Sequence, residues 1–283
     1  MFFIPDNVID NLIAEDVPYF DLTTWGLGFG NSYGTIEYFT REDMVLCGSE
    51  EVERIFHKLS ITPIDIMPSG AHIKAGESFI KATGIAENLH MAWKVGQNIL
   101  DHCSGISTKT DRMIQKAQAI NPHIMIVTTR KGFPGAKALM TKAVLTGGAF
   151  PHRLGLSETV LVFKQHMNFL GGLDGFIQQI PELKIKVCEK KLIVEAESLE
   201  SAIKLCNAGV DGLQFDKFSV SDLTIAVRTL KEINPSITIL GAGGINEKNI
   251  EEYASTGIHA IVTTNMYDAP PIDIGVKLYP TTV

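Results

Sequence analysis

Short apolar runs alternate with amphipathic segments through the C-terminal half of this chain. The amphipathic segments carry apolar residues at helical spacing, most clearly over residues 199–207 and 220–233. Repeated strand and helix patterns of this kind predict βα units and a parallel sheet, either open or closed into a barrel. The apolar runs that we interpret as strands cover residues 124–129, 159–163, 191–196, 212–216, 237–241 and 259–263.

Nearly every predicted strand ends in polar or glycine residues. In a βα barrel the carboxyl ends of the strands meet at one mouth, where the active site is built. Chance could place polar residues at one or two strand ends, but six such ends predict a shared site. In chain order these ends are Arg130-Lys131, Lys164-Gln165-His166, Glu195-Ala196-Glu197, Asp216-Lys217, Gly241-Ala242-Gly243-Gly244 and Thr263-Thr264-Asn265.

The first hundred residues follow a different pattern, which predicts a separate α+β layer. A long helix around residues 90–120 connects this layer to the βα series, and residues 273–283 are expected to return and pack on the layer. We therefore predict an N-terminal domain over residues 1–105, completed by residues 268–283, and a barrel domain over residues 106–267. The elements expected before the long helix are a helix near 6–14, alternating segments at 34–40 and 44–47, a helix at 50–59 and a strand and turn at 71–77.

The composition suits a globular protein and argues against several functions. The chain has 283 residues, a net charge of −7 and 45% apolar residues, so the protein lacks the basic balance that nucleic-acid or membrane-surface binding favours. The N-terminus has no signal-peptide pattern, and no apolar run approaches the roughly 18 residues of a membrane span, so we expect a soluble cytoplasmic protein. Four widely separated cysteines without metal-ligand spacing are interpreted as buried free thiols: Cys47, Cys103, Cys188 and Cys206.

A local excess of positive charge stands out against this acidic background. Residues 122–171 contain six lysines or arginines but only one acidic residue, Glu158. Such a concentration most simply serves a small polyanion, with arginine supplying planar donors for carboxylate or phosphate. The six basic residues are Arg130, Lys131, Lys137, Lys142, Arg153 and Lys164.

Three carboxylates follow two consecutive predicted strands. Glu195 and Glu197 lie on the same face of their strand because strand side chains alternate, and Asp216 ends the next strand. A pair of these could hold Mg²⁺ through water or accept hydrogen bonds from ribose hydroxyls, whereas the alternative is an ion pair with a neighbouring lysine. Lys131 and Lys164 could clamp pyrophosphate or carboxylate, and a weaker alternative is a Schiff-base lysine.

The glycine-rich segment 241–246 follows an apolar strand and is expected to open a helix. Glycine lets the backbone approach a ligand closely, and free amides at a helix start suit a phosphate. A tight βα turn without a ligand is the alternative. His152 could donate to a substrate carboxylate, although a capping or core histidine fits the spacing equally well.

Several of these motifs together resemble quinolinate phosphoribosyltransferase, also called nicotinate-nucleotide pyrophosphorylase. The resemblance extends over nearly the whole chain, and it is strongest to the ModD branch, which is encoded with molybdate transport genes. The motifs that carry it are Glu15-Asp16 followed by Asp21-Leu22-Thr23-Thr24, Trp93-Lys94, Ser104-Gly105-Ile106-Ser107-Thr108, Thr129-Arg130-Lys131, His152-Arg153-Leu154-Gly155-Leu156, Glu195-Ala196-Glu197, Phe215-Asp216-Lys217 and Gly243-Gly244-Ile245.

The resemblance implies an N-terminal α/β sandwich and an incomplete, open α/β barrel. It also implies a homodimer, or a higher oligomer, in which each N-terminal domain caps the partner's barrel mouth. The family transfers ribose 5-phosphate from phosphoribosyl pyrophosphate to a pyridine dicarboxylate with Mg²⁺, and it releases pyrophosphate and then carbon dioxide.

By position, the resemblance implies a role for each group of polar residues. Glu197 and Asp216 would face the ribose and the metal, and Lys131 would lie beside the pyrophosphate and the anomeric carbon. The remaining positions are Lys94, Arg130, His152, Arg153, Lys164 and His166 for the acidic substrate, and Gly241, Gly243, Gly244, Thr263 and Thr264 for the 5-phosphate.

The chain departs from the family pattern on the acceptor side. Lys94 replaces an arginine, which loses bidentate carboxylate recognition, and Phe163-Lys164 shifts a lysine by one position. We therefore expect a phosphoribosyltransferase whose acceptor is a small aromatic or heterocyclic acid other than quinolinate. The alternative is a non-catalytic protein that binds a phosphosugar or anion and is linked to molybdate transport.

Overall fold

The computed structural model describes residues 2–281, which fold into two compact units. The first unit comprises the chain up to Asp111, Gly132–Gly148, and the chain from Met266 onward. The second unit comprises Arg112–Lys131 and Ala149–Asn265. Residues 132–148 belong to the first unit in this division, whereas the sequence analysis placed them in the barrel.

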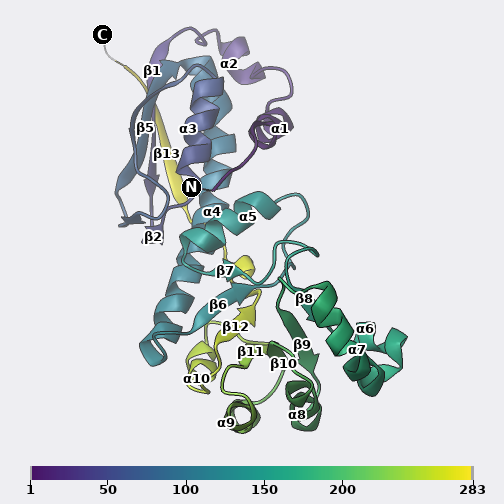
Figure 1. Ribbon diagram of the computed structural model, residues 1–283. Coiled ribbons are helices and arrows are strands. Elements are labelled where there is room, and N and C mark those ends of the chain that lie inside the picture. The colour runs from purple at the N-terminus through teal and green to yellow at the C-terminus, as the bar shows by residue number, and fades with distance from the viewer. Residues whose placement is uncertain (1, 282–283) are drawn as a thin grey trace. The chain divides into compact units, whose positions relative to one another are not determined.

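A four-stranded antiparallel sheet forms the framework of the first unit (Figure 1). Its strand order is β13-β1-β5-β3, so the last strand of the chain pairs with the first. This pairing confirms the expected return of the C-terminal segment, of which residues 282–283 lie outside the described residues. The strands are β1 (Tyr33–Thr40), β3 (Thr62–Ile66), β5 (Ser78–Ile85) and β13 (Ile274–Pro280).

The long helix α4 (Ala86–Ile120) begins in the first unit and ends in the second. Its hydroxyl groups bind the backbone of the short strand β2 (Met44–Val45): Ser107 donates to the carbonyl of Val45 at 2.7 Å, and Thr108 accepts from the Val45 amide at 2.9 Å. Part of the 104–108 motif therefore has a structural role. The other elements here are α1 (Asp6–Asp16), α2 (Leu22–Leu27), α3 (Ser49–Lys58), β4 (His72–Ile73) and α5 (Lys137–Thr146).

The carboxylate of Asp101, on α4 in the first unit, is in an environment that disfavours its charge. Its Oδ1 is buried and has no hydrogen-bond partner within residues 2–281. Burial, with repulsion from Asp273, raises the pKa of Asp101 from 3.8 to about 6. Because the unfolded chain ionises at the lower value, this residue destabilises the fold increasingly as the pH rises through that interval.

We therefore expect Asp101→Asn to raise the melting temperature at pH 7.5, and the gain to disappear below pH 4. Thermal denaturation at both pH values measures this. Asp65→Asn, at an exposed position of β3, serves as the control and should give no gain. An equal gain for Asp101→Asn at both pH values would show that charge is not the cause.

A seven-stranded parallel sheet forms the second unit, in the order β7-β6-β12-β11-β10-β9-β8. β7 and β8 lie at opposite ends of this order, so the sheet is an open barrel, as predicted. The strands are β6 (Met125–Thr128), β7 (Phe150–Pro151), β8 (Val160–Val162), β9 (Leu192–Ala196), β10 (Gly212–Asp216), β11 (Thr238–Ala242) and β12 (Ala260–Thr263).

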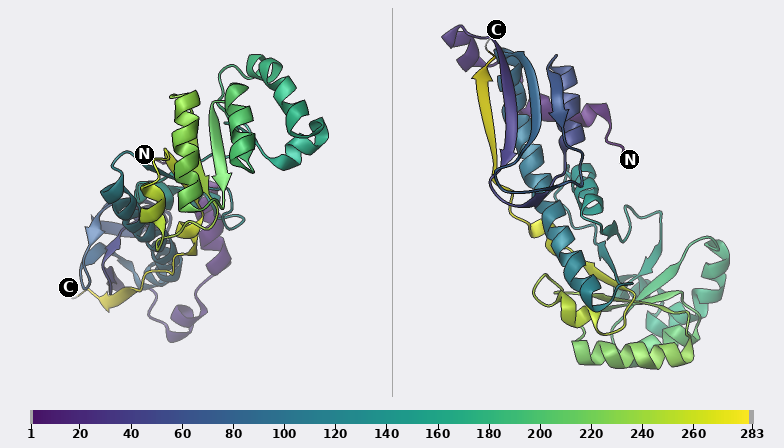
Figure 2. Two further views of the ribbon diagram at one scale, coloured as in Figure 1. Left: turned by 90° about the horizontal axis from the view of Figure 1, so that it is seen from below. Right: turned by 90° about the vertical axis from the view of Figure 1, so that its left-hand side faces the viewer.

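The helices α8 (Leu199–Asn207) and α9 (Val220–Ile233) cover the outer face of this sheet (Figures 1 and 2). Both match the predicted bounds, because serine side chains cap their first turns: Ser198 accepts from the Ser201 amide, and Ser219 accepts from the Asp222 amide. The remaining elements are α6 (Lys164–Met167), η1 (Asn168–Leu170), α7 (Gly172–Lys186), α10 (Ile250–Ala254) and η2 (Asn265–Asp268).

The interior face of the barrel sheet is apolar except at one place. Register partners in a parallel sheet share a face, and one row contains Ala260, Leu240, Gln214 and Glu195 on adjacent strands. Leu240 and Ala260 belong to the apolar cluster of this face, together with Ile193, Ala242 and Val262. Glu195 and Gln214 are thus the polar members of this row, near the carboxyl end of β9 and in the middle of β10.

Two further expectations concern the whole chain. Three cysteines are buried as free thiols, but Cys188 is exposed because it lies in the turn between α7 and β9, which corrects the prediction for that residue. None of the helices within residues 2–281 combines the length and apolar character that a membrane crossing requires.

Candidate functional site

Glu195 and Gln214 form the inner part of the polar cluster at the strand ends. The amide Nε2 of Gln214 donates to Oε2 of Glu195 at 3.1 Å. Burial raises the pKa of Glu195; the charges of Asp216 and Glu197 add to this effect, and Gln214 and Lys131 oppose it. Glu195 is thus within the electrostatic influence of both Lys131 and Asp216.

Asp216 ends β10 directly beside the glycine loop that follows β11. Gly243 has a φ of +84°, and a Cβ at this position would clash with Oδ1 of Asp216 and lie 2.5 Å from the amide nitrogen of Lys217. The amide of Lys217 also donates to the carbonyl of Ala242 at 2.8 Å. Glycine is therefore required here so that the loop can approach the carboxylate.

The rest of the glycine loop differs from the expected helix start. The helix α10 begins only at Ile250 and has 5 residues, so the glycine amides do not form a helix N-terminus. A Cβ on Gly244 would meet open space, whereas one on Gly241 would lie 3.0–3.1 Å from Ile258 and Leu223. Gly244 remains accessible to a ligand, and Gly241 serves close packing against the helix layer.

Thr263 ends β12 next to this loop, and Thr264 follows it. The hydroxyl of Thr263 donates to the carbonyl of Ile245 at 2.6 Å and accepts from the amide of Asn265 at 3.1 Å. Its side chain therefore fixes the loop. Thr264 is only partly buried, and its predicted role in phosphate binding stays a prediction.

Basic residues gather at the ends of β6 and β7. Burial, with repulsion from the nearby Arg130, lowers the pKa of Arg153. His152 precedes Arg153, and neither of its ring nitrogens has a hydrogen-bond partner in the described part of the chain. Burial, with repulsion from Arg153, also lowers the pKa of His152. A neutral imidazole donates from one nitrogen only, and this unpartnered N–H beside two close guanidinium groups suits an anionic ligand.

Lys164 and Glu197 form an ion pair across the ends of β8 and β9. Their side-chain atoms are 2.9 Å apart, and the side chains are 61% and 60% exposed. Glu197 therefore forms an ion pair with a neighbouring lysine, which was the alternative interpretation of its role. Its catalytic role stays a prediction. Phe163 stacks on His166 with ring centroids 5.8 Å apart, and the Phe163 amide donates to Nδ1 of His166 at 2.9 Å.

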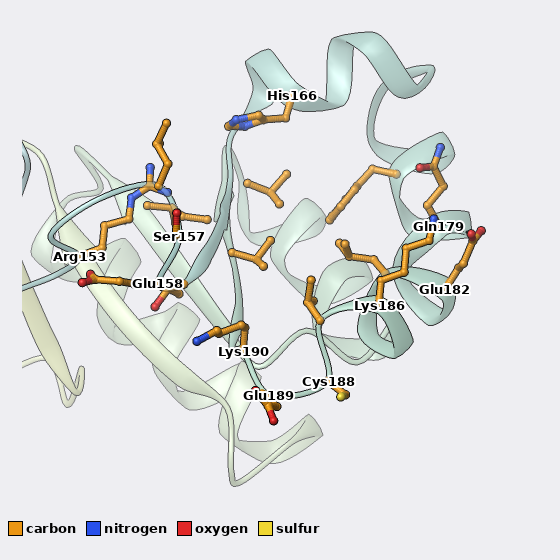
Figure 3. A pocket seen from close by; sticks show the side chains of 18 of the residues that line it. Arg153, Ser157, Glu158, His166, Gln179, Glu182, Lys186, Cys188, Glu189 and Lys190 are labelled. Carbon is orange, nitrogen blue, oxygen red and sulfur yellow. Dashed lines mark ion pairs between the residues drawn. The ribbon is translucent and has the colours of Figure 1, made fainter.

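A groove of about 840 Å³ lies between β8 and α7. Val160, Leu161 and Val162 of β8 line it, and so do Arg153 and His166. Lys131, Glu195 and Asp216 are not among its lining residues. Figure 3 shows Arg153 and Glu158 on one side of the groove and Gln179, Glu182 and Lys186 on the other.

Three of the basic residues that the sequence analysis named as candidates lie in the first unit. Lys142 is buried between Glu50, at 2.6 Å, and Glu51, so it neutralises two carboxylates and does not serve a polyanion. Lys137 belongs to the same segment. Lys94 lies 5.0 Å above the ring of Trp93 and donates to Gln97 at 3.0 Å.

The sequence analysis missed Gln214. It also did not show that Glu195 contacts Gln214 whereas Glu197 pairs with Lys164. The strand pattern contained a signal, because Gln214 is a polar residue at the position of a buried apolar one. No group of three His, Cys, Asp or Glu residues within residues 2–281 is arranged to hold a metal ion.

Both halves of the chain match models of known domains. Residues 21–104 match the N-terminal domain of quinolinate phosphoribosyl transferase, and residues 106–277 match its C-terminal domain. Together these matches cover most of the chain, including every residue of the strand-end cluster.

Individual relatives agree with this assignment. The chain is 36% identical to ModD of Pasteurella multocida over 98% of both chains, and 26% identical to the carboxylating nicotinate-nucleotide pyrophosphorylase of Homo sapiens over 96% of this chain and 91% of the human one. The fold matches the crystal structure of NadC from Streptococcus pyogenes with a TM-score of 0.89 and 24% identity over 100% of both chains. This chain therefore belongs to the quinolinate phosphoribosyl transferase family, whose members are pentosyltransferases.

Proposed function

We propose that the protein transfers ribose 5-phosphate from phosphoribosyl pyrophosphate to a small aromatic or heterocyclic acid other than quinolinate, and releases pyrophosphate. The observation that carries this proposal is the charge arrangement around Glu195. Its carboxyl group lies within electrostatic range of the cation Lys131 and of the carboxylates Asp216 and Glu197. Opposite charges thus lie close together at the strand ends of one barrel.

This arrangement fits the charge separation of the reaction. Breaking the bond between the anomeric carbon and pyrophosphate builds positive charge on the sugar ring and negative charge on the leaving group. Carboxylates beside the sugar and Lys131 beside the pyrophosphate stabilise both charges if they are fixed in place beforehand. Binding both substrates in line lowers the barrier further, and no covalent intermediate with the protein is required.

The residues that we assign to the acidic acceptor substrate combine cations with an aromatic surface. Arg130, Arg153 and the unpartnered ring N–H of His152 suit an acidic group. Phe163, backed by the ring of His166, adds a flat apolar surface at the end of β8. An aromatic ring with fewer acidic groups than a dicarboxylate matches this combination.

Magnesium is the proposed cofactor, with Glu197 and Asp216 as its protein ligands. The accumulation of negative charge that raises the pKa of Glu195, after burial, supports a divalent cation nearby. Mg²⁺ often binds through one or two carboxylates together with water and substrate phosphates. Such an ion would supply positive charge to the leaving pyrophosphate.

A homodimer with active sites at the interface is the proposed assembly. Five large apolar side chains in and next to α2 are more than half exposed, and large exposed apolar side chains that gather in one segment favour a protein interface there. The five residues are Tyr19, Phe20, Leu22, Trp25 and Leu27.

Pyrophosphate release from phosphoribosyl pyrophosphate, measured with a panel of aromatic acids, tests the proposal. We expect at least one acid to support release and quinolinate to support it poorly. Efficient turnover of quinolinate would contradict the proposed acceptor class. Binding of phosphoribosyl pyrophosphate without release for any acid would favour the non-catalytic alternative.

We also expect Phe163→Lys to increase the use of quinolinate. A lysine at this position would restore a cation for the second carboxylate, and one charge-assisted hydrogen bond corresponds to roughly 10- to 100-fold in kcat/KM. Phe169→Lys, at an exposed position of η1, is the matched control and should change nothing. An equal response of both variants would contradict the assignment of Phe163 to the acceptor side.

A further inference from the structure

The helix α7 leaves a groove of about 840 Å³ between itself and β8. It packs mainly against α6 and η1, whereas α8 packs directly on β9 and β10 (Figures 1 and 2). The helix layer therefore does not close over β8, and the groove remains open to a ligand.

Apolar side chains form the walls of this groove on both sides. Val162 and Phe176 are buried in its lining, whereas Leu156 is 74% exposed. Apolar side chains that gather in a concave, exposed site are typical of a binding site, because a ligand removes them from water. The apolar residues of the lining that are partly or fully exposed are Leu156, Val160, Leu161, Leu170, Leu183 and Val187.

The three lysine or arginine side chains that line the groove differ in their partners. Lys186 pairs with Glu182 at 2.7 Å and is 66% exposed, and Lys190 is also exposed. Arg153 is partly buried and forms no ion pair within residues 2–281. Figure 3 shows Arg153 on the opposite side of the groove from Lys186. The groove thus has one end with a positive charge that no neighbouring carboxylate balances.

We propose that this groove binds a free monocarboxylic acid with an extended apolar chain, whose carboxylate pairs with Arg153 and whose chain lies between β8 and α7. An arginine matches a carboxylate with two parallel hydrogen bonds, and the walls favour an apolar chain. The lining part of α7, from Phe176 to Lys186, is about 15 Å long, which suits a single alkyl chain. Glu195 and Asp216 do not line the groove, so this site goes beyond the proposed transfer reaction.

Calorimetry with hexanoate, octanoate and decanoate tests the site, below their micelle concentrations and without phosphoribosyl pyrophosphate. We expect affinity to rise roughly two- to fourfold with each added methylene, because each one buries further apolar surface. Decyltrimethylammonium has the same chain and the opposite charge, and it should bind about tenfold or more weakly than decanoate.

Arg153→Met should weaken decanoate binding roughly 10- to 100-fold, the range of one charge-assisted hydrogen bond. Lys190→Met removes an exposed cation from the same lining and should leave the affinity unchanged.

Leu183→Asp places a charge in the apolar wall and should weaken decanoate binding roughly tenfold or more. Ile185→Asp is the matched control, because Ile185 lies on the same helix, is 78% exposed and does not line the groove. If Leu183→Asp does not fold, Leu156→Asp, at an exposed position of the lining, is judged by the same criteria.

Three results would each overturn the inference: an affinity that does not depend on chain length, equal binding of decyltrimethylammonium, or wild-type affinity in Arg153→Met. Sedimentation equilibrium tests a second copy of this chain as the occupant. A wild-type oligomer that does not bind decanoate and is dissociated by Leu183→Asp, but not by Ile185→Asp, would also overturn the inference. These outcomes leave the proposed function intact, because pyrophosphate release measures it separately.

Discussion

Lys131→Met is expected to reduce pyrophosphate release by about 10²- to 10³-fold in kcat. Lys131 is the cation that acts on the Glu195 carboxyl at the strand ends, and its amide donates to Oγ1 of Thr129 at 3.2 Å. A fixed charge that meets the developing negative charge contributes mainly in the transition state, so kcat should fall more than the affinity for phosphoribosyl pyrophosphate. Steady-state kinetics with the best acid of the panel measures both quantities.

The control for this experiment is Lys190→Met. Lys190 is exposed and precedes β9, so it lies at the opposite end of that strand from Glu195. It should retain wild-type kinetics, which separates a local role of Lys131 from a loss of overall positive charge. A decrease for Lys131→Met of less than fivefold, or one shared by the control, would contradict its placement beside the leaving group.

Lys142→Met is expected to cause the largest loss of stability, about 3–5 kcal/mol. The lysine side chain is 8% exposed, and Glu51 beside it is 3% exposed. Although burial opposes its charge, hydrogen bonds to Glu50 and Glu51 raise the pKa of Lys142. Removing the cation leaves Glu51 as an uncompensated buried charge between α3 and α5. Urea denaturation monitored by circular dichroism measures the free energy of unfolding.

Two further variants identify the cause of this loss. Lys204→Met removes a lysine from the exposed ion pair with Glu200 on α8, and it should cost less than about 1 kcal/mol. Adding Glu51→Gln to Lys142→Met should restore part of the stability, because the unpaired buried charge is then gone. A loss for Lys142→Met as small as that for Lys204→Met would contradict the importance of this cluster.

Local patterns predicted much of the barrel. The helices α8 and α9 follow from apolar spacing and serine caps, and β10 follows from a short apolar run that ends in Asp216. These signals are contained within about ten consecutive residues. The strands β3 and β5 were missed, because they are specified by the pairing of β5 with β1 and of β3 with β5, and not by their own alternation.

The candidate site was predicted less completely, because spatial partners are not visible in a local pattern. Alternation placed Glu195 and Glu197 on one face, but only the register with β10 shows that Glu195 meets Gln214. Similarly, Lys142 stood with the other basic residues in the sequence, yet its partners Glu50 and Glu51 come from α3, about ninety residues earlier.

A crystal structure with phosphoribosyl pyrophosphate and an active aromatic acid tests the central claim most directly. The account predicts the pyrophosphate beside Lys131, the ribose hydroxyls at Glu195 and Asp216, and the 5-phosphate at the Gly243-Gly244 turn. A phosphosugar bound elsewhere, for example in the groove between β8 and α7, with the strand ends of the barrel left empty, would contradict it.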